Sequence, residues 1–230
     1  MYFYYDPFYM MVLLPVLLIT VYAQLNVNSS FKRYSKITNS RYLTGAQAAE
    51  AVLHSHGIYN VRIERVRGNL TDHYDPRTNV IRLSDSVYDS ATISAVGVAA
   101  HEAGHAVQYA EGYGPIQVRA AIIPVTQVGS QFGIVLLIVG IPLTSEPLFL
   151  VGIILFSFTT LFQLITLPVE FNASRRAMET IRGQQLLTDE EADGARKVLS
   201  AAAMTYVAAL LMSIVQLLRF VLMFAGRRRD

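Results

Sequence analysis

The chain has 230 residues, of which 53% are hydrophobic and only 16% are charged, a composition too apolar for an ordinary soluble domain of this length. The formal net charge is only +2, so the composition gives no reason to expect a nucleic acid as partner. The chain has no cysteine, which excludes disulfides and leaves histidine and carboxylate side chains to hold any metal.

Residues 1–25 are predicted to form an N-terminal membrane anchor. The apolar run of residues 8–23 follows Asp6, whereas a secretory signal carries basic residues before its apolar run. A cleaved signal is the alternative, and the missing basic residues favour an anchor that is retained. The run is short for a membrane span, and residues 1–5 could extend it.

Residues 26–115 are predicted to form a soluble part that carries the chemistry. Thr44 and Gln47 have the spacing of a capping box, which predicts a helix over residues 45–56. Residues 59–66 alternate in part between apolar and polar side chains, as a half-buried strand does.

A β-hairpin is predicted to follow this strand. The turn sequence at residues 75–79 separates two short segments, residues 70–74 and residues 80–83. An extended peptide can pair with the edge of a sheet, and by analogy with enzymes that hold a substrate in this way, residues 80–83 are expected to pair with a substrate here.

The motif H-E-x-x-H occupies residues 101–105. His101 and His105 are four residues apart, so on a helix they share one face and their imidazoles can converge on one zinc ion. Glu102 leaves the helix at a different angle, from which it can reach a water at the metal without being a ligand. The alternative is a helix whose two histidines serve packing or solvation.

The helix that carries this motif is predicted to be buried, because alanine and glycine surround the two histidines within residues 90–110. Titratable groups in such a place need a partner, and a divalent cation is the simplest one. Ser90 is the expected N-cap, and the helix is expected to end at a cluster of turn residues: Gly112, Gly114 and Pro115.

Residues 116–168 are predicted to form a transmembrane helical hairpin, and residues 201–230 a last membrane helix. The apolar runs of residues 120–141 and 148–167 are each long enough to cross a bilayer. Polar residues in the first run are expected to face other helices rather than lipid: Thr126, Gln127, Ser130 and Gln131.

The basic residues predict that the chemistry takes place on the cytoplasmic side of the cell membrane. With four spans, two loops on one side carry basic residues close to the membrane: Lys32, Arg33, Lys36, Arg41, Arg175, Arg176, Arg182, Arg196 and Lys197. Basic residues at the C-terminus favour the opposite orientation: Arg227, Arg228 and Arg229.

A catalytic zinc needs three protein ligands and one open position, so a third ligand must come from outside the motif. Glu170, in the segment 169–200 that is predicted to form a helix and a linker, is the best candidate. A carboxylate beside an apolar run needs a cationic partner. From the residues alone, an ion pair with Arg175 or Arg176 explains Glu170 equally well. The other histidines are weaker candidates: His54, His56 and His73.

Three sequence blocks together resemble the YugP-like neutral zinc metallopeptidases, a family of small bacterial membrane proteins. These blocks are LTDHYDP at residues 70–76, HEAGH at residues 101–105 and LPVEFNASRRA at residues 167–177. The chain is more distantly similar to the HtpX-type membrane endopeptidases, in which a glutamate in an E-x-x-A-D helix completes the zinc site. This resemblance implies that Glu170 is the third ligand. The pattern departs at Ser174, which stands where the aspartate is expected, so a carboxylate that orients a ligand histidine is missing or comes from elsewhere.

The sequence therefore predicts a mainly α integral membrane protein with a small β element and a gluzincin-like H-E-x-x-H helix. One Zn²⁺ per chain is expected, held by His101, His105 and Glu170, with Glu102 as general base for peptide-bond hydrolysis. The expected substrate is an unfolded or membrane-proximal polypeptide. An oxyanion donor is also needed, and the candidates are His73, Tyr74 and Tyr206.

Two other functions remain open. One is a catalytically idle membrane scaffold that has kept a metal-binding helix. Glu102 argues against it, because a purely structural site has no need of a carboxylate that is not a ligand. The other is a zinc hydrolase that acts on an amide or ester other than a peptide.

Overall fold

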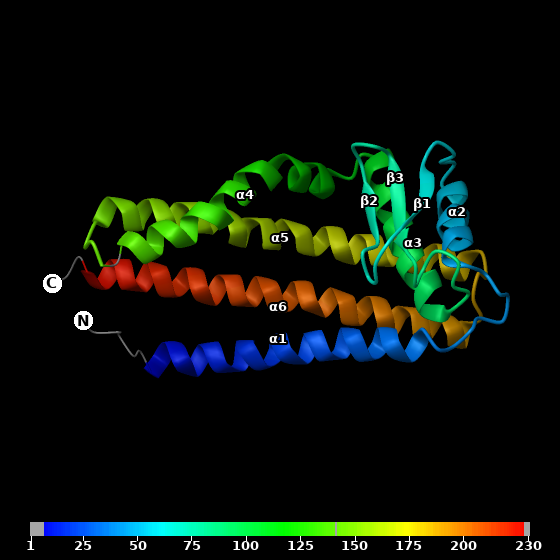
Figure 1. Ribbon diagram of the computed structural model, residues 1–230, viewed down its shortest axis with the longest axis horizontal. Coiled ribbons are helices and arrows are strands. Elements are labelled where there is room, and N and C mark those ends of the chain that lie inside the picture. Colours follow the sequence, from blue (N-terminus) through cyan, green and yellow to red (C-terminus); the bar gives the residue numbers. More distant parts are fainter. Residues whose placement is uncertain (1–6, 141, 228–230) are drawn as a thin grey trace. The chain divides into compact units, whose positions relative to one another are not determined.

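The computed structural model describes residues 7–140 and 142–227 of the chain. Residues 1–5, Arg228 and Arg229, which entered the predictions of the anchor and of the orientation, lie outside the described residues. The described elements follow one another along the chain (Figure 1): α1 (Pro7–Tyr34), α2 (Gly45–Ser55), β1 (Arg62–Val66), β2 (His73–Asp75), β3 (Val80–Ser84), α3 (Ile93–Ala110), α4 (Gly114–Gly140), α5 (Glu146–Gly183) and α6 (Asp189–Arg227).

Four of these helices are long and apolar enough to cross a membrane. They cover Tyr9–Tyr34, Gly114–Gly140, Glu146–Gly183 and Asp189–Gly226. Together with one small sheet, they confirm the prediction of a mainly α membrane protein with a small β element. All four begin or end beyond the predicted apolar runs, since polar residues continue each helix past its apolar part.

The chain divides into two compact units, and the division falls within the four long helices. The span unit contains the described residues before Gln24, residues 118–167 and the described residues after Met204. The sheet unit contains residues 24–117 and 168–204.

In the span unit, glycine residues bring α4 and α5 close together. A Cβ added at Gly129 would lie 2.5 Å from the carbonyl oxygen of Leu155, and one at Gly152 would lie 3.0 Å from the backbone nitrogen of Leu137. Small residues are typical where membrane helices approach each other closely. The expected burial of the polar residues on α4 is not observed, since three of them are exposed in this chain: Gln127, Ser130 and Gln131.

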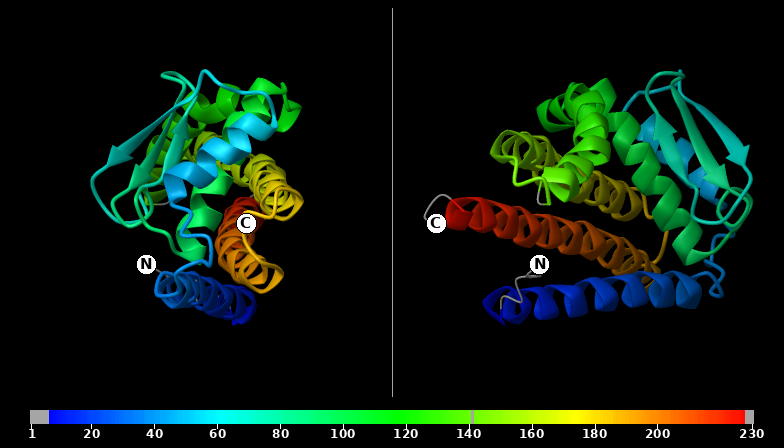
Figure 2. Two further views of the ribbon diagram at one scale, coloured as in Figure 1. Left: turned by 90° about the vertical axis from the view of Figure 1, so that its right-hand side faces the viewer. Right: turned by 60° about the vertical axis from the view of Figure 1, so that its left-hand side comes forward.

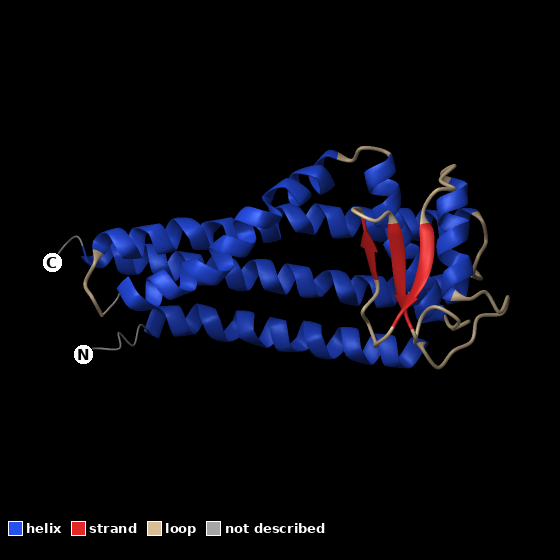
Figure 3. Cartoon of the chain, turned by 45° about the horizontal axis from the view of Figure 1, so that its top comes forward, coloured by secondary structure: helices blue, strands red, loops and turns tan. Residues whose placement is uncertain are grey.

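The sheet unit holds the three strands in the order β1-β3-β2 (Figure 3). β3 pairs with β1 in parallel and with β2 in antiparallel. The predicted hairpin is therefore present, but the expectation that residues 80–83 pair with substrate is wrong, because β3 is the central strand with a neighbour on each side. Its position follows from its composition, since Val80, Ile81 and Leu83 are fully buried. The edge nearer the H-E-x-x-H helix is β2, which contacts α3.

Two capping predictions can be compared with the structure. α2 begins with the predicted capping box, in which Thr44 accepts from the Gln47 backbone and the Gln47 side chain accepts from the Thr44 backbone. α3 is capped by Thr92 instead of Ser90, because the Thr92 hydroxyl accepts a hydrogen bond from the backbone N–H of Ala95. α3 ends at Ala110, and of the three residues predicted to end it, Gly112 follows with a φ of 66°, whereas Gly114 and Pro115 already belong to α4.

α3 is the buried helix of the sheet unit, as its small residues predicted. It packs against α2 (Figure 2), and the core between them contains side chains that are almost fully buried: Ala48, Val52, Val96, Ala99 and Ala103. A helix with this many alanines presents a smooth surface, so neighbouring backbones can approach it closely.

Candidate metal centre

Two helices of the sheet unit bring three ligand side chains together. His101 and His105 project from α3, and Glu170 projects from α5. One ligand atom from each of the three lies within 4.8 Å of the others. Nε2 of His101 lies 3.2 Å from Oε2 of Glu170, and Nε2 of His105 lies 3.5 Å from the same oxygen.

These separations fit a zinc ion. Ligand atoms at about 2.0–2.1 Å from a tetrahedral zinc lie roughly 3.3–3.4 Å from one another. Two imidazole nitrogens and one carboxylate oxygen are also the ligand set of a catalytic zinc, which keeps its fourth position open. The residues present therefore fit the metal in both geometry and chemistry.

The alternative interpretation of Glu170 as the partner of a neighbouring arginine is not observed. Arg175 lies 3.9 Å from Glu179, and Arg176 is bonded to Glu111 and Asn172. Glu170 is only 2% exposed, and both imidazoles lie beside its carboxylate. A buried carboxylate in this position needs a cation, and the two histidines can share one with it.

The protonation of His105 responds to the same carboxylate. Burial alone would lower the pKa of His105, but the hydrogen bond to Glu170 and the negative charges of Glu170 and Glu102 raise it above its ordinary value. The cluster therefore favours a positive charge at the position where the three ligand atoms converge.

The two ligand helices can meet because Gly104 has no side chain. A Cβ added at Gly104 would lie 2.7 Å from the carbonyl oxygen of Ala173 on α5. Ala173 and Ala177 are fully buried on the facing surface. The glycine inside the motif is thus what lets His101 and His105 approach Glu170.

Replacing Gly104 with Ala is expected to destabilise the protein by about 1–3 kcal/mol, because the added methyl group meets a backbone oxygen that cannot rotate away. Thermal unfolding of the purified protein in detergent measures this loss. Gly114→Ala is the matched control, since a Cβ there meets nothing within 4 Å. Equal loss in the two variants would show that the close approach of α5 at Gly104 is not responsible.

Both ligand histidines are held through their Nδ1 atoms. Nδ1 of His105 lies 3.0 Å from Oε1 of Gln108, and Nδ1 of His101 lies 3.1 Å from Oγ of Ser174. Gln108 is fixed in this orientation because its Nε2 donates to the carbonyl of Val169 at 2.8 Å. Its Oε1 must then accept from the Nδ1–H of His105, so in the neutral imidazole the lone pair of Nε2 is the one directed at the point where the ligand atoms converge.

These contacts answer the question that Ser174 raised in the sequence. The aspartate expected at this position is absent, and the Ser174 hydroxyl itself lies against His101. The residue that supports His105, Gln108, was missed by the sequence analysis. The presence of a polar side chain three residues after His105 in an otherwise apolar helix could have indicated this role, and Gln108 is completely buried in the structure.

Ser174→Ala is expected to weaken zinc binding by about 10–100-fold, the usual effect of losing a partner that orients a ligand. Competition with a chelator of known zinc affinity measures the change. Ser157→Ala on the same helix is the control, because the Ser157 hydroxyl donates to the carbonyl of Ile154 within that helix. Unchanged affinity in Ser174→Ala would mean that the hydroxyl does not orient His101.

Glu102 lies outside the ligand cluster. Its Oε2 accepts a hydrogen bond of 3.1 Å from the backbone N–H of Tyr74 in the edge strand β2. This contact holds the carboxylate beside the histidines and directly against the strand edge.

The oxyanion candidates lie in different surroundings. The ring of His73 is exposed and its Nδ1 lies 2.8 Å from the carbonyl oxygen of Thr71. The hydroxyl of Tyr74 donates to Asn79 at 2.8 Å, and its ring lies 5.6 Å from that of Tyr109 on α3. Tyr206 belongs to the span unit, so the sheet unit by itself does not place it. Of the three, Tyr74 is joined to the site, through its backbone.

The remaining histidines form other contacts in the sheet unit. His54 lies 3.9 Å from Glu50, and His56 lies 3.1 Å from Glu111. Neither belongs to the cluster of ligand atoms.

A membrane protein with an H-E-x-x-H helix and a glutamate from a second helix has the ligand set of a zinc metallopeptidase. Residues 9–225 match the family described as "Putative neutral zinc metallopeptidase", and the chain belongs to this family. It is 49% identical over 212 residues to "Putative membrane protease YugP" of Bacillus subtilis (strain 168), covering 92% of this chain and 94% of that protein. The resemblance found in the sequence is confirmed. No solved structure matches the chain.

Proposed function

We propose that the protein is a membrane-embedded zinc endopeptidase that holds one zinc ion per chain through His101, His105 and Glu170. The observation that carries this proposal is the convergence of these three ligands beside a carboxylate, Glu102, that is not among them. Membership of a zinc metallopeptidase family and the relative's printed name support the same function.

In the proposed hydrolysis, Glu102 and the two ligand histidines would each have a separate role. When bound, the zinc would supply Lewis acidity that lowers the pKa of a water toward neutrality. Glu102 would accept a proton from the attacking water at its carboxylate and deliver it to the leaving amine. His101 and His105 would stay neutral and keep their Nε2 atoms directed at the metal, because Ser174 and Gln108 hold their Nδ1 atoms.

The substrate would be an extended polypeptide beside the edge strand β2. β3 already has two neighbouring strands, whereas within the described residues β2 pairs with β3 alone. A segment that adds to β2 would bring its peptide bonds next to Glu102, because Tyr74 in this strand is bonded to that carboxylate.

The substrate is also expected to lie close to the membrane. Glu170 follows the apolar run of residues 148–167 on the same helix. At a rise of about 1.5 Å per residue, Glu170 lies within roughly 10 Å of the end of that run. A loosely folded or membrane-tethered polypeptide can present a peptide bond there more easily than a folded soluble protein can.

Metal removal tests the proposal. The purified protein is expected to cleave casein, to lose this activity when a chelator removes the metal, and to regain it when zinc is added back. A zinc-loaded protein that cleaves neither casein nor a membrane-tethered peptide would favour the idle scaffold. Cleavage of esters without cleavage of peptides would favour a zinc hydrolase that acts on an amide or ester other than a peptide.

The basic residues of the two loops support a proposed site on the cytoplasmic side, and single cysteines test this. The chain has no cysteine of its own, so Arg67→Cys and Thr188→Cys each give one reactive thiol on an exposed position of the sheet unit. Both are expected to escape an impermeant thiol reagent in intact cells and to react after lysis. Leu143→Cys, in the exposed turn between α4 and α5, is expected to react in intact cells. The reverse pattern would place the site outside.

A further inference from the structure

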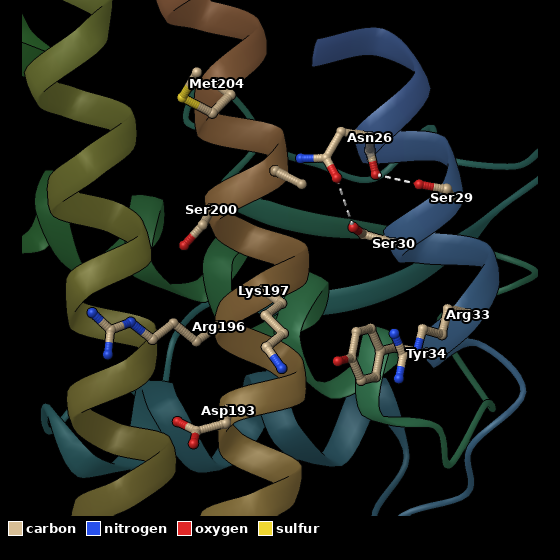
Figure 4. A pocket seen from close by; sticks show the side chains of 11 residues that line it. Asn26, Ser29, Ser30, Arg33, Tyr34, Asp193, Arg196, Lys197, Ser200 and Met204 are labelled. Carbon is tan, nitrogen blue, oxygen red and sulfur yellow. Dashed lines mark hydrogen bonds between the residues drawn. The ribbon is translucent and has the colours of Figure 1, made fainter. Parts of the chain in front are cut away.

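A pocket of 770 Å³ lies in the sheet unit between the C-terminal part of α1 and the N-terminal half of α6 (Figure 4). None of the ligand residues and neither Glu102 nor Tyr74 lines it. The proposed peptidase function therefore gives it no role. Its wall on α1 begins at Asn26, just after the apolar part of that helix, and its wall on α6 ends at Met204, where the apolar part of that helix begins.

The pocket has an excess of positive charge. Arg33 from α1 and Lys197 from α6 lie on facing walls, and within the described part of the chain neither is in an ion pair (Figure 4). Asp193 is the acidic residue of the lining, and its Oδ1 lies 2.7 Å from Arg182. Its charge is thus already balanced. Arg196 also lines the pocket, but its guanidinium extends to the other side of α6 in this view.

The lining changes in the same order along both helices. From the apolar part of α1 outward, Asn26 comes first, Ser29 and Ser30 follow with their hydroxyls bonded to Asn26, and Arg33 is last. On α6 the corresponding order is Met204 and Ala201, then Ser200, then Lys197. Arg33 lies seven residues from Asn26, and Lys197 lies seven residues from Met204. At about 1.5 Å per residue, each cation is therefore roughly 10 Å beyond the start of the pocket.

This order matches a phospholipid that lies along the two helices. Acyl chains would meet the end at Met204, ester oxygens would meet the hydroxyl of Ser200, and the phosphate would meet the two cations. Arginine and lysine are the usual phosphate-binding side chains, and basic pockets between membrane helices bind anionic headgroups.

We propose that this pocket binds an anionic phospholipid through its headgroup phosphate, with Arg33 and Lys197 as the phosphate ligands. A free phosphate would use the same two cations but has no use for the hydroxyls and the apolar end. A phospholipid would contact all three parts of the pocket, namely the apolar end, the hydroxyl-bearing middle and the two cations.

Binding of phosphatidylglycerol to the purified full-length protein in phosphatidylcholine nanodiscs tests this proposal. Each cation near an anionic membrane contributes about fivefold in affinity, so Arg33→Gln together with Lys197→Gln is expected to weaken binding by roughly 30-fold. Arg62→Gln together with Arg67→Gln is the matched control, because it removes the same charge from exposed positions elsewhere in the sheet unit. An equal loss in both double variants would reduce the effect to general surface attraction and overturn the proposal.

Two further variants and two competing anions distinguish a lipid inside the pocket from a lipid at the surface and from free phosphate. Ser200→Phe keeps every charge but fills the pocket, so it is expected to block the lipid, whereas Arg33→Lys is expected to retain it. Undiminished binding in Ser200→Phe would mean that the lipid does not enter the pocket. Glycerol phosphate and inorganic phosphate are expected to compete weakly, and competition as strong as that of the lipid would assign the site to free phosphate instead. All these measurements can be made on metal-free protein, so they do not depend on the peptidase activity.

Discussion

Glu102→Gln is expected to keep the zinc and to lower peptide hydrolysis by roughly two to four orders of magnitude, the usual contribution of a general base. The ligand cluster does not include Glu102, so the metal should remain at one per chain. The amide oxygen of glutamine can still accept the hydrogen bond that Tyr74 donates to Oε2 of Glu102. The position of the side chain is therefore kept, and only its ability to take a proton is removed.

The measurement pairs metal analysis with casein cleavage on the same sample. Glu50→Gln, which removes an exposed carboxylate on α2 of the same unit, is the control and is expected to retain full activity. A Glu102→Gln protein that cleaves casein at the wild-type rate would contradict the assignment of the base. Loss of zinc in this variant would instead make Glu102 a ligand.

The parts of the site that the sequence predicted are those fixed by local geometry. His101 and His105 share a helix face whatever the rest of the fold does, because their spacing is four residues. The same holds for the Thr44 capping box and for the hairpin around the turn at residues 75–79, which the structure contains.

Glu170 is different, because 65 residues separate it from His105 and spacing cannot bring them together. From the residues alone, an ion pair with Arg175 or Arg176 was equally acceptable, and only the family resemblance favoured the metal. The structure removes the alternative, since both arginines are bonded elsewhere. It also shows what the sequence hid, namely that Gly104 admits the backbone of Ala173.

Two of the wrong predictions concern the order of the strands and the choice between two neighbouring N-caps. Alternation of apolar and polar residues identifies a strand but not its neighbours, so the central place of β3 could not be read from residues 80–83. Its nearly continuous apolar sequence was the available signal, since a strand buried on both faces loses the alternation. Ser90 and Thr92 are both good N-caps, and the choice depends on where the chain turns into α3, next to the bridge between Thr38 and Thr92.

Removing the ligands is expected to abolish zinc binding, and Glu170 is the decisive one. His101→Ala together with His105→Ala should leave no bound zinc, because both nitrogen ligands are gone. Glu170→Gln is expected to weaken binding by more than the 10–100-fold that follows from the loss of an orienting partner. A neutral amide oxygen is a poorer ligand than a carboxylate, and the negative charge that balances the ion is lost.

Glu179→Gln is the matched control for this variant. Glu179 lies on the same helix and is exposed, and its Oε1 lies 3.9 Å from Nε of Arg175. The zinc content of the Glu179→Gln protein should therefore equal that of the wild type. Thermal unfolding of the metal-free proteins separates a folding defect from a binding defect. Without the ion, the free energy of unfolding of Glu170→Gln should fall below that of the wild type by no more than the contacts of Glu170 with His101 and His105 contribute. Full zinc occupancy in Glu170→Ala would remove Glu170 from the metal site.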